Sequence, residues 1–137
     1  MFSKYLSLTY RQYQHYMRDK LKEYKIGNSE YPILFCLKSN PKSCQNQVVK
    51  LSKLNKSLVS KGVKKLNELE YIKILIDSNH SQRQNLVLTE KGEKLIPKIE
   101  KFIMEWEEII MDGLATEDRK NLYKFMERVE ENSIKMR

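Results

Sequence analysis

The sequence predicts a mainly α fold that carries one small β-hairpin, in a chain of 137 residues. Two observations support this prediction. Along most of the chain, apolar residues recur at three- and four-residue steps, which is the period of a helix with one buried face. Between residues 71 and 89 the pattern changes to the alternation of strands, in the runs YIKILI and NLVLT, which the polar segment DSNHSQRQ separates.

The first two helices are expected at residues 1–24 and at about 30–38. The segment IGNSE at 26–30 suits the end of the first helix, because Gly and Asn tolerate the left-handed backbone of a C-terminal stop. Ser29 can cap the second helix, and Pro32 lies in its first turn, where the missing N–H is harmless. One face of the first helix carries an apolar and aromatic stripe: Leu6, Tyr10, Tyr13, Met17, Leu21 and Tyr24.

A helix-turn-helix pair is expected next, with helices at about 44–51 and 56–69. The segment KSNPKS at 38–43 is a turn, and Ser43 and Asn55 are the expected N-caps of the two helices. The positions expected to face inward are Val48 and Leu51 in the first helix, and Val59, Val63, Leu66 and Leu69 in the second.

Two further helices are expected after the hairpin, at 89–112 and at about 117–132. Thr89 and Thr116 are their expected caps. Pro97 should kink the longer helix one turn in or delay its start. The buried stripe of this helix is expected to contain Leu95, Ile99, Phe102, Trp106 and Ile109.

The charge of the chain lies mostly in its first part. The formal net charge is +8, and residues 1–83 hold 16 Lys and Arg against 6 Asp and Glu, a net of +10. Residues 84–137 hold 10 against 12, a net of −2. A polyanionic partner is therefore expected to bind the first part of the chain.

The segment KLSKLNKSLVSKGVKKL at 50–66 carries six lysines and no acid. A solvated helix face normally mixes both signs of charge, because oppositely charged pairs four residues apart stabilise a helix. The order helix, helix, turn, helix, hairpin is that of a winged helix-turn-helix. The second helix of the pair then packs its apolar stripe on the protein and turns its polar face to DNA: Lys56, Ser57, Ser60, Lys61 and Lys64.

The segments KLNKSLVSKGVKKLNELEYI at 53–72 and NLVLTEKGEKL at 85–95 resemble the MarR family, the multiple-antibiotic-resistance regulators. With the helices on both sides, the resemblance covers nearly the whole chain. It implies a dimeric winged-helix transcription regulator whose terminal helices form the dimer. The implied parts are an N-terminal dimerisation helix at 1–28, a DNA-binding lobe at 29–90 and C-terminal dimerisation helices at 91–137.

The same resemblance assigns the recognition helix to 56–65, with Ser57 at its usual short polar position and Lys61 at its usual basic position. It assigns to 77–84 the wing that reaches a neighbouring minor groove. The wing is the main departure from the family.

The family wing commonly has Asp-x-Arg or Asp-Arg-Arg, with the second arginine seven residues before the threonine of LT. Here that position is Gln82, Arg83 follows it, and His80 or nothing stands at the aspartate position. Either the wing is one residue shorter and Arg83 enters the minor groove, or readout by the wing is weaker. We favour Arg83, because narrow minor grooves attract cationic side chains.

The function expected from these features is sequence-specific binding of double-stranded DNA by a homodimer. The protein would act as a transcriptional repressor on a pseudo-palindromic operator, with release by a small aromatic or anionic effector as a further possibility. The alternatives are a winged-helix module for protein interaction and a non-specific nucleic-acid-binding protein. The predicted DNA-contacting residues are Ser43, Gln45, Lys53, Lys56, Ser57, Ser60, Lys61, Lys64, His80, Gln82 and Arg83.

Other classes of site lack support in the sequence. We expect no enzyme, because there is no phosphate-binding glycine loop and no nucleophile paired with a base. We expect no cofactor and no metal, because His15 and His80 lack ligands at metal spacing. The two cysteines suit a reducing cytoplasm, with no membrane span. Cys36 is expected to pack, while Cys44 at a helix N-terminus is a candidate reactive thiol.

A group of tyrosines on the first helix has two readings. Tyrosines on one helical stripe usually belong to a core or a dimer interface. They could instead line an effector cavity between the dimer helices and the DNA-binding lobe, as the resemblance implies. The residues concerned are Tyr5, Tyr10, Tyr13, Tyr16 and Tyr24.

Overall fold

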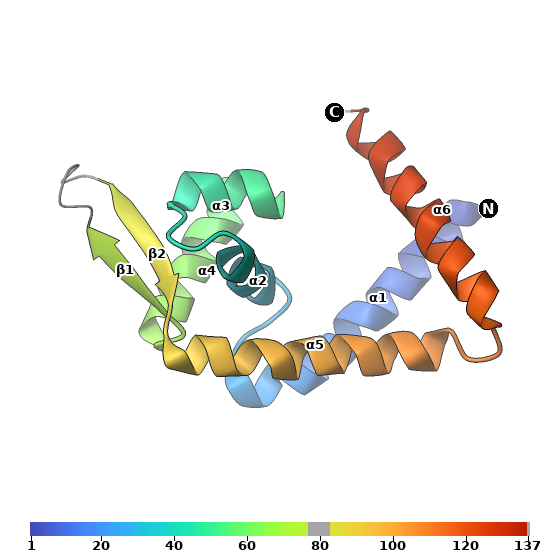
Figure 1. The fold of residues 1–137 in the computed structure, drawn as a ribbon, viewed down its shortest axis with the longest axis horizontal. Coiled ribbons are helices and arrows are strands. Elements are labelled where there is room, and N and C mark those ends of the chain that lie inside the picture. Colours follow the sequence, from blue (N-terminus) through green and yellow to red (C-terminus); the bar gives the residue numbers. More distant parts are fainter. Residues whose placement is uncertain (77–82, 137) are drawn as a thin grey trace. The chain divides into compact units, whose positions relative to one another are not determined.

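The computed structural model of the chain describes residues 1–76 and 83–136. The chain divides into two compact units, Met1–Ile103 and Met104–Arg137. Figure 1 shows the order of the elements, and the mainly α fold with one hairpin is confirmed. The elements are α1 (Phe2–Leu21), the 3₁₀ turn η1 (Lys22–Tyr24), α2 (Tyr31–Ser39), α3 (Gln45–Ser52), α4 (Lys56–Glu68), β1 (Ile72–Ile76), β2 (Gln84–Leu88), α5 (Glu90–Ile110) and α6 (Thr116–Ile134).

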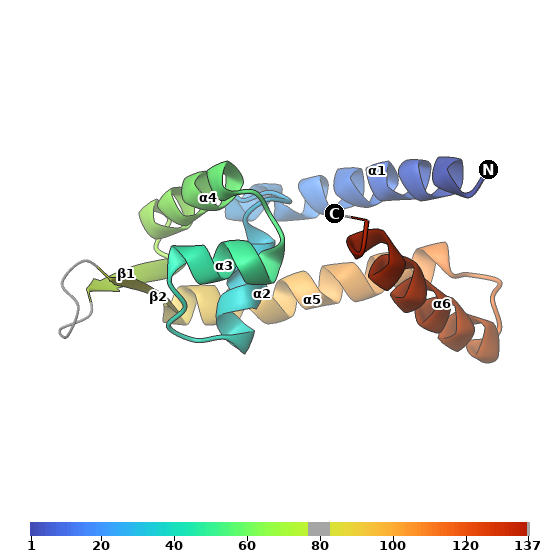
Figure 2. The same ribbon diagram turned by 90° about the horizontal axis from the view of Figure 1, so that it is seen from above.

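The core of the first unit forms where the apolar stripes of several helices meet. In Figure 2, α2, α3 and α4 gather over the first half of α5, with the hairpin at one end. The expectation that Leu51 faces inward is wrong, because Leu51 is 50% exposed. Helix α3 buries only Val48, and Leu54 in the following turn packs against the core in its place. The fully buried side chains include Met17, Leu21, Leu34, Val59, Leu66 and Ile99.

Helix α1 contributes to this core with its second half only. Met17 and Leu21 are fully buried, whereas Leu6 and Tyr10 are 45% and 57% exposed. The predicted stripe is therefore a core surface at one end and an exposed apolar surface at the other.

The hairpin pairs β1 with β2 in antiparallel register, from Ile72 opposite Leu88 to Ile76 opposite Gln84. It is also joined to the segment before α3. The backbone of Cys44 forms an isolated antiparallel β-bridge with Asn85. The Leu86 N–H donates to the Ser43 carbonyl at 2.9 Å. The base of the wing is thus tied to the start of the helix-turn-helix pair.

The start of α5 locks the corner between α4 and β1. Thr89 is the cap that the sequence predicts: its hydroxyl accepts from the Gly92 N–H at 3.1 Å and donates to the Glu70 carbonyl at 2.6 Å. The Lys91 amine donates to the Leu69 carbonyl at 2.7 Å. Pro97 lies inside α5, so the helix neither ends nor starts late at this residue.

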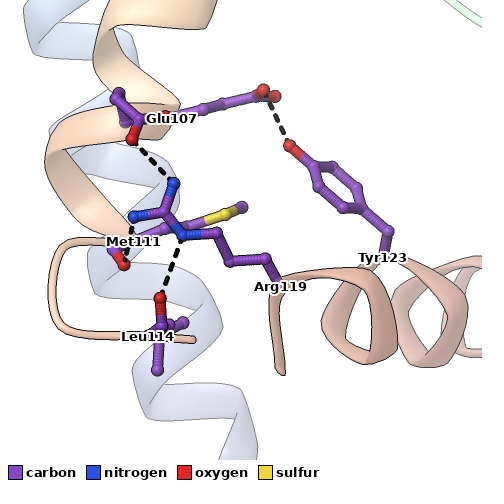
Figure 3. A network of polar contacts seen from close by, with 6 residues as sticks. Glu107, Met111, Leu114, Arg119 and Tyr123 are labelled. Carbon is purple, nitrogen blue, oxygen red and sulfur yellow. Dashed lines mark hydrogen bonds and ion pairs between the residues drawn. The ribbon is translucent and has the colours of Figure 1, made fainter. Parts of the chain in front are cut away.

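The second unit is a helical hairpin made by the end of α5 and by α6. The Arg119 guanidinium donates to the Met111 carbonyl at 3.1 Å and to the Leu114 carbonyl at 3.2 Å (Figure 3). It also donates to the Glu108 carboxylate at 2.7 Å. It thereby satisfies carbonyl groups at and after the C-terminus of α5. The expected cap Thr116 is wrong, because Ala115 is the N-cap of α6 and makes no side-chain bond.

Candidate nucleic-acid interface

The turn between α3 and α4 sets the position of the candidate recognition helix. Lys53 has a left-handed backbone with φ 60°, which reverses the chain after α3. The Ser52 hydroxyl then accepts from the Leu54 N–H at 3.2 Å. Asn55 caps α4 as predicted, since its side chain accepts from the Leu58 N–H at 2.8 Å. Local hydrogen bonds thus define where α4 begins.

Helix α4 has the two faces that the sequence predicts. Its buried face contains Val59, Gly62, Val63 and Leu66. A Cβ atom on Gly62 would lie 2.5 Å from the Ile33 side chain, so the glycine allows α4 to approach α2 closely. Its exposed face carries the predicted contact residues Lys56, Ser57, Ser60, Lys61 and Lys64.

A buried carboxylate, which the sequence analysis missed, fixes the C-terminal half of α4. Glu30 has a side chain only 11% exposed, and it accepts from Lys65 at 2.9 Å and from the Gly27 N–H at 3.0 Å. The sequence feature that could have pointed to Glu30 is its position: it is an acidic residue directly before the apolar run of α2, in a basic part of the chain. Lys65 is therefore a structural residue, unlike its neighbours on the exposed face.

The exposed lysines of α4 are available to a ligand. Among the residues that the structure describes, Lys56, Lys61 and Lys64 make no ion pair. Three ammonium groups on one side of one helix attract an anion, since no carboxylate in the described ranges is paired with them. This arrangement suits contacts with phosphate groups.

The other predicted contact residues differ in how exposed they are. Ser43 is buried, and its hydroxyl donates to the Asn40 carbonyl at 2.7 Å, so this side chain serves the turn before α3. Gln45 is half-buried in the first turn of α3, and Lys53 is exposed in the turn after it. Arg83 is exposed directly before β2. His80 and Gln82 lie outside the described residues.

The cap of α3 differs from the prediction. Cys44 is the N-cap in place of Ser43, and its thiol takes part in a capping box with Gln47. The Gln47 side chain accepts from the Cys44 N–H at 2.8 Å. Cys44 is half-buried, and Cys36 is buried in the core as expected, where desolvation raises the pKa of its thiol.

The five tyrosines of α1 and η1 divide into an exposed pair and a set that packs against the core. Tyr5 and Tyr10 are exposed, while Tyr13, Tyr16 and Tyr24 pack against the core. The Tyr13 and Tyr31 hydroxyls form a hydrogen bond, and burial raises the pKa of Tyr31.

The described part of the chain lacks two further kinds of feature. No helix there is long and apolar enough to span a membrane. No group of three or more His, Cys, Asp or Glu side chains in that part could hold a metal ion.

The chain resembles known transcriptional regulators over most of its length. It is 25% identical over 127 residues to the HTH-type transcriptional regulator BilQ of Clostridioides difficile, covering 88% of this chain and 86% of that protein. It is 23% identical over 113 residues to the uncharacterized HTH-type transcriptional regulator YybA of Bacillus subtilis, covering 82% of this chain and 75% of that protein. No protein-family model matches the chain.

Solved structures extend the resemblance to the whole fold. A crystal structure of a MarR transcriptional regulator from Methanosarcina mazei Go1 superposes with a TM-score of 0.89 and 28% identity. The superposition covers 99% of this chain and 91% of that one. All three of these relatives are named as regulators of transcription.

Proposed function

We propose that this chain, a winged helix-turn-helix protein of the MarR type, binds a pseudo-palindromic DNA operator as a homodimer and represses transcription from it. The observation that carries the proposal is the exposed face of α4. Lys56, Lys61 and Lys64 on this face make no ion pair with any residue that the structure describes, while the opposite face is buried in the core. A major groove about 12 Å wide accepts one such helix.

The division of labour on α4 follows from the chemistry of its side chains. Lys56, Lys61 and Lys64 meet phosphates, because an ammonium on a long stem reaches the DNA backbone on either side of the groove. Ser57 and Ser60 are short, so the helix can approach the base edges closely, and a hydroxyl can donate to or accept from them. This face therefore combines affinity from charge with discrimination from short polar groups.

Exposed apolar side chains support the homodimer. In the first unit several of them lie together on the first half of α1, and in the second unit several lie on the end of α5 and on α6. Patches of this kind mark association surfaces. Two recognition helices in a dimer would sit about 34–36 Å apart, one turn of duplex DNA. The exposed residues include Phe2, Tyr5, Leu6, Leu8 and Tyr10 in the first unit, and Ile109, Leu122, Phe125 and Ile134 in the second, so the expectation that Ile109 is buried is wrong.

The proposal includes control by an effector. A small aromatic or anionic molecule would release the operator by changing the separation of the two recognition helices, since only one separation matches the DNA. A panel of aromatic acids and cell metabolites, added to the operator complex, tests this step. Unchanged DNA affinity across the panel contradicts it.

The main proposal is tested by selecting duplexes from a random pool and measuring binding to the enriched site. A single base change in a half-site should cost about 1–3 kcal/mol. Lys61→Ala should weaken binding to all duplexes and lower the steepness of the salt dependence by about 0.9, because one phosphate contact is lost. Equal affinity for every duplex would contradict sequence-specific repression and favour a non-specific binder.

A further inference from the structure

We propose that a pocket between the end of α2, the turn before α3, strand β2 and the start of α5 binds a small zwitterion with an apolar body, an apolar amino acid or a dipeptide of such residues. The inference goes beyond the proposed function, because it assigns a ligand site that requires neither DNA nor a second copy of the chain. The pocket has a volume of about 390 Å³. Sites for small molecules usually have volumes of about 300 to 1,000 Å³.

Most of the pocket lining is apolar and comes from all four segments. A site of this size with few polar groups favours a ligand whose main part is apolar. Contacts beside the pocket hold its walls together. The Lys38 amine donates to the Glu100 carboxylate at 2.7 Å, which links α2 to α5, and the Leu86 N–H donates to the Ser43 carbonyl, which links β2 to the turn before α3. The apolar lining residues are Leu37, Pro41, Val87, Leu88, Ile96 and Pro97.

Two side chains of opposite charge line this pocket without neutralising each other. Lys42 lies in the turn before α3, and Glu93 lies in the first turn of α5. Within residues 1–76 and 83–136 neither of them makes an ion pair, whereas Lys38, which also lines the pocket, is paired with Glu100. The two unpaired charges match a ligand that offers a carboxylate to Lys42 and an ammonium group to Glu93.

Pro97 gives the pocket a backbone acceptor as well. In a regular α-helix the N–H of residue 97 would donate to the carbonyl of residue 93, but proline has no N–H. The Glu93 carbonyl therefore lacks its usual helical donor, and both Glu93 and Pro97 line the pocket. An ammonium group has several N–H donors, enough for the Glu93 carboxylate and this carbonyl oxygen together.

The pair of charges favours a zwitterion over two simpler ligands. A carboxylic acid would cover Glu93 without giving its carboxylate a partner, and an amine would do the same to Lys42. Removing a charged group from water costs free energy unless the group is paired. A ligand that carries both an ammonium group and a carboxylate avoids both costs. The apolar body of the ligand then fills the space between Val87, Leu88 and Ile96.

NMR titration of the full chain with the apolar amino acids and their dipeptides tests the proposal. Leucine should shift the backbone amide signals of Val87 and Leu88 in a saturable way. Isocaproic acid lacks the amine of leucine, and isoamylamine lacks its carboxylate. Each of these two analogues should bind about tenfold or more weakly than leucine, because it loses one charge-assisted hydrogen-bonding group.

Two substitutions show which side chain holds which group of the ligand. Lys42→Gln should weaken leucine binding about tenfold or more without weakening isoamylamine binding. Glu93→Gln should weaken leucine binding by about the same factor without weakening isocaproic acid binding. The matched control is Lys94→Gln, which removes an exposed charge next to Glu93 from outside the pocket and should bind every probe as the parent protein does.

Three results would overturn the inference. The first is that no apolar amino acid or dipeptide shifts these signals at concentrations up to about 10 mM. The second is that isocaproic acid or isoamylamine binds as tightly as leucine, which would mean that the pocket does not recognise a zwitterion. The third is that Lys42→Gln and Glu93→Gln bind leucine as tightly as Lys94→Gln does. Since the titration contains no DNA, its result is independent of whether the chain binds an operator.

Discussion

Gly92 lies where the first turn of α5 crosses the corner between α4 and β1. A Cβ atom at this position would be 2.1 Å from the Tyr71 carbonyl oxygen, which itself accepts from the Thr89 N–H at 3.1 Å. Backbone atoms cannot yield as the end of a flexible side chain can. The glycine of the LTEKG motif is therefore required by close packing between two backbones.

Gly92→Ala should destabilise the protein by about 1–3 kcal/mol or more, because the added methyl group must displace the α4–β1 corner. Urea denaturation followed by circular dichroism measures the change. Gly27→Ala is the matched control, since its Cβ would lie 3.8 Å from the nearest atom, an ordinary contact. If both variants unfold at the same urea concentration, the close approach at Gly92 carries no cost.

The buried tyrosines make stability depend on alkaline pH. Burial raises the pKa of Tyr31 and of Tyr71 above the usual value. Below about pH 10 these phenols are protonated in both the folded and the unfolded protein. At higher pH the unfolded chain loses the protons first, so stability should fall as pH rises through this range.

The measurement is the urea midpoint between about pH 9 and pH 11, compared between the parent protein and Tyr31→Phe. The variant loses the hydrogen bond to Tyr13 at every pH, but its stability should decline less steeply as pH rises. A parallel decline in both proteins would show that Tyr31 does not contribute to the pH dependence.

At the scale of elements, an asymmetric ion pair joins α4 to the residue before α2, in addition to the packing of its apolar face. The Glu30 side chain is nearly buried, whereas that of Lys65 is 49% exposed. Removing the Glu30 carboxylate leaves the half-buried Gly27 N–H without its acceptor. Removing the Lys65 amine leaves a carboxylate that still accepts from this N–H.

Glu30→Ala should therefore cost about 1–3 kcal/mol, and Lys65→Ala no more than about 1 kcal/mol. Denaturant unfolding of both single variants and of the double variant gives the coupling between them. Equal losses in the two single variants would contradict the unequal burial as the cause.

Some features of the helices could be predicted from the sequence and others could not. The stripes of α4 and the cap Asn55 were predictable, because local periodicity and local hydrogen bonds decide them. The N-caps Cys44 and Ala115 were not predictable from the sequence, because the residue at which a helix begins also depends on tertiary contacts of the preceding segment. Leu51 was misplaced because a short helix shows no clear inner face until its neighbours are known.

The candidate site divides in the same way. The exposed lysines of α4 follow from the period of one helix, so sequence located them. The position of Arg83 beside the turn before α3 depends on the β-bridge between Cys44 and Asn85, a contact between distant segments that no local pattern encodes. Glu30 was missed for the same reason, because its partner Lys65 lies 35 residues away.

At the scale of the molecule, the exposed apolar residues of α6 need a partner. None of the residues of α6 is buried within the chain, and Phe125 is 63% exposed. Such a helix gains little stability from its own chain, because an amphipathic helix is stabilised mainly by packing of its apolar face. In the proposed homodimer, this face is covered by the second copy.

Phe125→Ala should weaken the dimer by about 2 kcal/mol or more while leaving the monomer folded, since an aromatic anchor is removed from an interface and not from a core. Sedimentation velocity over a concentration series measures the dissociation constant, and Lys124→Ala is the control on the adjacent exposed position. Operator affinity at low protein concentration should fall with dimer stability, because one recognition helix holds only a half-site. If Phe125→Ala stays as dimeric as the control, the interface lies on other residues. If the parent protein is monomeric at all concentrations, the proposal that a homodimer binds two half-sites is contradicted.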